Sequence, residues 1–148
     1  MEQFSRTVEA VQLVSKVADE IIDEARTMAE HMVAELSTLK LQIPQQAGSR
    51  FRHSFTLAGP NRLTLHLHFS NDITNSLDRA VLAVRIIRAR DEWDQESKIN
   101  IVERYELRPA FDKEMKVFWT DSKLTFATGT ALLDFTFDRF VTALTNDR

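Results

Sequence analysis

The longest apolar pattern in the chain runs from Phe4 to Leu39 and predicts one uninterrupted helix. Apolar or small residues recur at alternating steps of four and three, and Ser15 is the one polar member of the series. The series is Phe4, Val8, Val11, Ser15, Ala18, Ile22, Ala25, Ala29, Met32, Leu36 and Leu39. No Gly or Pro interrupts it, and Pro44 follows its end. This pattern is typical of a helix that faces another element along its whole length.

The length of this helix predicts self-association. At 1.5 Å per residue, some 36 residues span about 54 Å, whereas a compact domain of this size has a diameter of roughly 38 Å. The helix should therefore extend past its own domain, and a second copy of the chain would cover the apolar part that extends. The predicted dimer seam consists of Val8, Val11, Ala18, Ile22, Ala25, Ala29, Met32 and Leu36. In the alternative interpretation, the helix kinks or frays and crosses only its own sheet.

A second kind of pattern, strict alternation of apolar and polar residues, begins near residue 50. It predicts strands at Arg50–Leu57 and Arg62–Phe69, joined by a turn rich in Gly and Pro. The apolar faces of these two strands match when Phe51 pairs with Phe69, Phe55 with Leu65, Arg52 with His68 and Ser54 with His66. His66 and His68 then project from the opposite face, close to Arg52.

Further strands are predicted in the second half of the chain. Arg79–Arg90 is apolar on both faces, with Leu82, Val84 and Ile86 on one side, and is typical of a central strand. Lys98–Arg108 alternates, with Ile99, Ile101, Tyr105 and Leu107 on one side, and Pro109 is expected to end it. Met115–Thr120 and Lys123–Thr128 predict a hairpin whose two-residue turn pairs Trp119 with Leu124 and Val117 with Phe126.

The chain ends in a second helical pattern, Ala131–Leu144, for which Thr130 is the expected N-cap. The predicted fold is α+β, because the helices flank the strands in the sequence. It combines a long N-terminal helix, an antiparallel meander sheet of about six strands, and a short C-terminal helix packed with the first on one face of the sheet. Residues 1–148 form one domain, divided into a helix at 1–42, a linker at 43–49, the sheet at 50–128 and a helix at 130–145.

Composition narrows the possible functions. The 148 residues include no Cys, which excludes disulfides and thiolate chemistry, and only 3 Gly, too few for a phosphate loop or dinucleotide fingerprint. The formal net charge is −3, so nucleic acid is not an expected partner. The start of the chain lacks the apolar core of a secretion signal, and no apolar run is long enough to span a bilayer. We therefore expect a cytoplasmic protein without a membrane segment.

One candidate site stands out. Residues 45–90 contain seven Arg and two acidic residues, and His66 and His68 lie on one face within this basic segment. His-x-His on a strand has metal-ligand spacing, but neighbouring Arg side chains oppose a divalent cation. We consider Arg50, Arg52, His66 and His68 as candidates for contact with an anion or an acidic protein partner. The alternative interpretation is a solvated sheet face without a ligand.

The functional hypotheses follow from these features. The first is a non-enzymatic homodimeric interaction or regulatory protein that associates through the long helix. The second is a carrier or sensor of a small apolar ligand, because 10 Phe, 2 Trp and several Met supply an adaptable apolar lining between the sheet and the helices. An enzyme ranks third, and no cofactor is expected.

Overall fold

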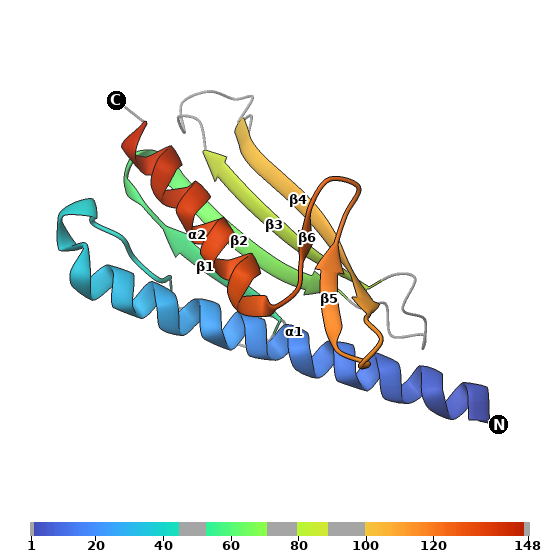
Figure 1. Cartoon of the computed structure of the whole chain (residues 1–148). Helices are drawn as coiled ribbons and strands as arrows, with labels where there is room; N and C mark the ends of the chain where they lie inside the picture. Colours follow the sequence, from blue (N-terminus) through green and yellow to red (C-terminus); the bar gives the residue numbers. More distant parts are fainter. Residues whose placement is uncertain (1, 45–52, 71–79, 89–99, 147–148) are drawn as a thin grey trace, which may run out of the picture.

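The computed structural model describes residues 2–44, 53–70, 80–88 and 100–146. The elements are α1 (Glu2–Glu35), the 3-10 turn η1 (Ser37–Leu39), β1 (Ser54–Ala58), the 3-10 turn η3 (Pro60–Arg62), β2 (Leu63–Ser70), β3 (Val81–Arg88), β4 (Asn100–Phe111), β5 (Val117–Thr120), β6 (Thr125–Phe126) and α2 (Gly129–Thr145). Each strand pairs antiparallel with the next, in the order β1-β2-β3-β4-β5-β6. The predicted α+β fold is confirmed: a six-stranded meander follows the long helix in the sequence and precedes the short one (Figure 1).

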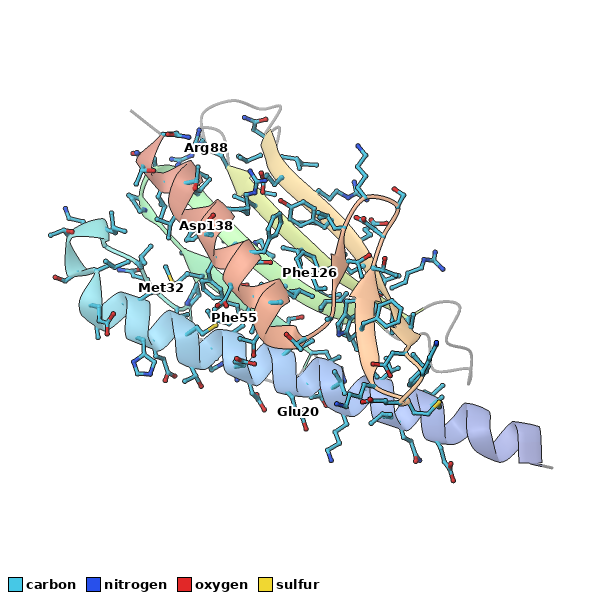
Figure 2. All side chains as sticks on the ribbon, viewed as in Figure 1. Glu20, Met32, Phe55, Arg88, Phe126 and Asp138 are labelled. Carbon is cyan, nitrogen blue, oxygen red and sulfur yellow. The ribbon has the colours of Figure 1, made fainter. Side chains whose placement is uncertain are left out.

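The core lies between one face of the sheet and the two helices. Alternate residues of each strand point into it, as the period of two in the sequence predicts. Its fully buried members include Phe55, Leu57, Leu63, Leu65, Leu67, Leu82, Val84, Ile86, Leu107 and Trp119 from the strands, and Ala18, Ala25, Ala29, Leu132, Leu133 and Phe140 from the helices. Figure 2 shows Phe55 in this layer and Glu20 on the outward side of α1, where it is exposed.

α1 is one helix of 34 residues, about 51 Å long at 1.5 Å per residue. Figure 1 shows its N-terminal turns running past the β5 side of the sheet, so the predicted extension beyond the domain is present. The helix ends at Glu35 rather than at Leu39. The chain turns back there because Gln42 and Ala58 exchange two backbone hydrogen bonds of 2.8 Å, which anchor the segment after the helix to β1. Most of the predicted linker at 43–49 lies outside the described residues.

α2 begins beside the middle of α1 and crosses the sheet diagonally (Figure 1). Its N-cap is Thr128, whose hydroxyl accepts a hydrogen bond of 3.1 Å from the Ala131 N–H, so the prediction of Thr130 as the cap is wrong. The hydroxyl of Thr130 donates instead to Glu24 on α1, at 3.1 Å. The cap thus lies two residues earlier than predicted, and Gly129 occupies the first turn of the helix.

The close approach at Gly129 predicts an unequal effect of the same substitution at two glycines. A Cβ at Gly129 would lie 2.7 Å from Cγ1 of Ile21, a buried side chain, so we expect Gly129→Ala to lower the free energy of unfolding by about 1–3 kcal/mol. At Gly59 the nearest atom is the flexible tip of Leu144, at 2.8 Å, and φ is an ordinary −115°. Gly59→Ala is therefore the matched control with the smaller loss. Urea denaturation measures both, and an equal loss at the two positions would contradict the packing argument.

The first hairpin has a different register from the predicted one. The observed partners are Ser54 with His68, Phe55 with Leu67, Thr56 with His66 and Leu57 with Leu65. The loop is longer than a simple turn, because η3 occupies it and the Gly59 N–H donates to the Leu63 carbonyl at 2.7 Å. A shift of two residues leaves every side chain on its predicted face. The predicted pairs that involve Phe51 and Arg52 lie outside the described residues.

The second hairpin is shifted in the same way. Trp119 pairs with Phe126, rather than with Leu124, and a four-residue loop replaces the predicted two-residue turn. Oδ1 of Asp121 accepts hydrogen bonds from the N–H groups of Lys123 and Leu124, at 2.7 and 2.6 Å, and these bonds stabilise the wider loop. The predicted burial of Trp119 and Phe126 is retained.

β4 differs from its prediction at both ends. A bulge at Val102 places Ile101 opposite Ile87, on the face away from the helices, where Ile101 is half exposed. At the other end the strand continues through Pro109, which pairs with Trp119 of β5. Pro109 is tolerated because β3 pairing ends at Leu107, so its missing N–H interrupts no bond to β3.

Candidate functional site

His66 and His68 project from β2 on the sheet face opposite the helices. Across β1 their partners are Thr56 and Ser54, and across β3 His66 faces Arg85. The neighbouring cation is thus Arg85, which the sequence analysis did not single out. Arg50 and Arg52, the predicted cationic neighbours, lie outside the described residues.

Hydroxyl groups orient both imidazole rings. Nδ1 of His66 lies 3.1 Å from the Thr56 hydroxyl oxygen, and Nδ1 of His68 lies 2.6 Å from that of Ser54. Nδ1 of each ring is therefore engaged within the sheet, and Nε2 is the remaining polar atom of each ring. In the neutral tautomer that accepts a hydrogen bond from the hydroxyl at Nδ1, the ring proton lies on Nε2 and can be donated to a ligand.

The electrostatic environment disfavours protonated imidazoles. Partial burial and the Arg85 guanidinium lower the pKa of His66 below its usual value. For His68, burial, His53 and Arg85 lower the pKa. On the adjacent strand, the pKa of the Glu106 carboxyl is lowered mainly by its hydrogen bond from Arg104, at 2.5 Å. The surroundings of the two histidines are thus cationic overall.

His66, His68 and Arg85 line a depression of about 380 Å³ on the sheet face opposite the helices, which we call the open face. Its lining consists of Ser54, Thr56, His66, Leu67, His68, Ala83, Arg85 and Ile87. Polar groups from β1, β2 and β3 converge there, while Ala83 and Ile87 contribute an apolar part. Within the described ranges, no three His, Asp or Glu side chains converge as metal ligands. The polar members of the lining are the two imidazoles, the hydroxyls of Ser54 and Thr56, and the guanidinium of Arg85.

The candidate seam of α1 is buried in its middle and more exposed towards its ends. Ala18, Ile22, Ala25 and Ala29 are at most 1% exposed, because the chain's own sheet and α2 cover them. At the C-terminal end, Met32 is half-buried against the same core and Leu36 is 37% exposed. At the N-terminal end, Val11 is half-buried, and the side chain of Val8 lies outside the described residues. The accessible part of the seam is therefore confined to its two ends.

An apolar groove borders the N-terminal end of the seam. It has a volume of about 430 Å³ and is lined by Glu9, Ala10, Leu13, Phe111 and Met115. Leu13 and Met115 are 37% and 62% exposed. Leu13 was not among the predicted seam residues, because it lies off the heptad series. The sequence feature that could have indicated Leu13 is its apolar side chain at a helix position outside the core-facing stripe.

Two polar contacts tie α1 and α2 to the sheet. His53, beside β1, contacts Asp19 of α1 at 2.5 Å. On β4, Glu103 accepts a hydrogen bond from the Tyr105 hydroxyl and lies 3.7 Å from Arg139 of α2. Burial, followed by the bond to Glu103, raises the pKa of Tyr105. Because Glu103 already has two partners, its cluster is more consistent with holding α2 against β4 than with chemistry.

Comparison of the chain with protein-family models, with curated proteins and with solved structures found no match. Among the helices that the structure describes, none has both the length and the apolar character required to cross a membrane.

Proposed function

We propose that the protein is a non-enzymatic interaction or regulatory protein that forms a homodimer through the N-terminal end of α1. The observation that supports this proposal is the apolar groove around Leu13 and Met115, at the point where α1 leaves the sheet. A cytoplasmic location, expected from the sequence, belongs to the same proposal.

A second copy is the proposed occupant because this groove borders the N-terminal part of α1, which continues past the sheet (Figure 1). Val11 continues the apolar stripe of α1 towards its N-terminus and is half-buried, and Ala10 and Leu13 line the groove together with Phe111 and Met115. In a twofold arrangement, the N-terminal turns of one copy would lie against the same surface of the other. Each copy would then cover the apolar part of the other that extends past the sheet.

Light scattering coupled to size-exclusion chromatography tests the dimer. We expect a mass of about 34 kDa at tens of micromolar, which is twice 17.1 kDa. Leu13→Glu would place a charge in the apolar contact and should weaken dimerisation at least about 100-fold. Leu36→Glu is the matched control, because Leu36 is equally exposed at the other end of the seam. A monomer in the unmodified protein, or equal weakening by both substitutions, would refute the proposed location.

The carrier of a small apolar ligand remains a prediction. The space between the sheet and the helices contains large side chains with almost no exposure, such as Phe55, Trp119 and Phe140. This packing gives no specific support for a ligand in that layer.

A further inference from the structure

The depression on the open sheet face is separate from the proposed dimer contact. It lies across the sheet from the helices, on the strands β1, β2 and β3. A volume of about 380 Å³ matches the size of pockets that hold small molecules. Its occupant can therefore be considered independently of the oligomeric state.

The polar groups of the depression are donors suited to an anion. Arg85 provides a guanidinium with up to five N–H donors, and it lies opposite His66 on the neighbouring strand. The rings of His66 and His68 are held through Nδ1 by Thr56 and Ser54, which fixes the direction of each Nε2. This arrangement of donors on rigid strands is preorganised, so little ordering accompanies ligand binding.

The surrounding charge also favours an anion. Arg85 lines the depression and lowers the pKa values of both histidines, His53 lowers the pKa of His68, and Arg104, Glu106 and Arg108 lie on the neighbouring strand β4. Asp19 pairs with His53, and Glu106 pairs with Arg104, so each of these carboxylates already has a basic partner. Within the described residues, Arg85 has no carboxylate at ion-pair distance. Its guanidinium lines the depression and also contributes to the lowered pKa of the Glu106 carboxyl.

We propose that this depression binds the oxyanion group of a small organic acid, a carboxylate or a phosphate, between His66, His68 and Arg85. Ala83 and Ile87 lie beside the carbon skeleton of this ligand. Ile101 pairs with Ile87 on the same face and extends the apolar surface. The ligand class is thus an anionic head with a short apolar tail.

Binding should depend on pH in a defined direction. In the unliganded protein the pKa values of His66 and His68 are lowered, so both rings are mostly neutral near pH 7. A bound oxyanion stabilises the protonated rings and raises these pKa values. Ligand binding is then coupled to proton uptake, and affinity increases as the pH falls. Each unit by which the ligand raises one pKa corresponds to about a tenfold gain in affinity.

NMR titration of the histidine ring protons tests the site in the full chain. The probes are inorganic phosphate and hexanoate, and each is added at about pH 7.5 and about pH 5.5, on either side of the usual histidine pKa. We expect saturable shifts of the His66 and His68 signals, with affinity at least about tenfold higher at the lower pH. The exposed His31 on α1 is the internal reference. Tighter binding of hexanoate would identify a carboxylate with a tail, and tighter binding of phosphate a phosphoryl group.

Two arginine substitutions complete the test. Arg85→Met keeps an unbranched apolar stem but removes the guanidinium and its charge, and we expect it to weaken binding at least about tenfold. Arg26→Met is the matched control, because Arg26 is exposed on α1 and pairs with Asp23 at 3.6 Å. Shifts of His66 and His68 that do not exceed those of His31, or unchanged binding in Arg85→Met, would overturn the proposal.

Discussion

Trp119→Ala should lower the free energy of unfolding by about 3–5 kcal/mol. Trp119 is fully buried on β5, pairs with Phe126 across the hairpin, and makes an edge-to-face contact with Phe69 at a centroid distance of 6.0 Å. Truncation would leave a cavity in the core between the sheet and the helices, and the rigid strands would close it only partly. A domain of this size has a total stability of about 5–15 kcal/mol, so urea denaturation should show a large shift.

Two further variants test whether the stability loss comes from the cavity at Trp119 and not from the removal of any aromatic side chain on β5. The indole N–H of Trp119 has no hydrogen-bond partner among the described residues, so Trp119→Phe removes a buried donor together with some volume. We expect this variant to lose only about 1–2 kcal/mol. Phe118→Ala truncates the next side chain, which is half-buried on the opposite face, and should also lose less than Trp119→Ala. A loss of less than about 1 kcal/mol in Trp119→Ala would contradict a central role for this ring.

The sequence predicted the faces of the strands because alternation is a local property. Leu82, Val84 and Ile86 point into the core as predicted, and so do Trp119 and Phe126. Each hairpin register was nevertheless wrong by two residues. A two-residue shift preserves every face, so the apolar pattern does not distinguish the two registers. The choice depends on loop hydrogen bonds, such as those of Asp121, which depend on the conformation of the loop.

The candidate site was predicted in part. The sequence indicated that His66 and His68 share a face, and it indicated a cationic neighbour. It did not identify Arg85, because the partner of His66 across β3 depends on a long-range register. Ile101 was placed on the wrong face for a similar reason, since a single bulge at Val102 inverts the alternation beyond it.

The heptad pattern of α1 predicted its apolar side, but it did not specify what covers that side. A sheet of the same chain and a helix of a second copy select the same residue types at the same spacing. In the structure, the chain's own core covers Ala25 completely. The small side chain at position 25 then allows α1 to pack closely against the core of its own chain.

Ala25→Leu should lower the free energy of unfolding by about 1–3 kcal/mol, because three added carbon atoms have no space in the core beneath α1. The matched control is Ala34→Leu, on the same helix at an exposed position, which should change stability by no more than about 0.5 kcal/mol. Urea denaturation measures both variants, and light scattering reports their mass. If Ala25→Leu instead changed the mass and left the stability of the monomer unaltered, Ala25 would belong to a contact between copies. A stability loss without a change in mass would assign the middle of α1 to the core of its own chain and leave the N-terminal end around Leu13 for association.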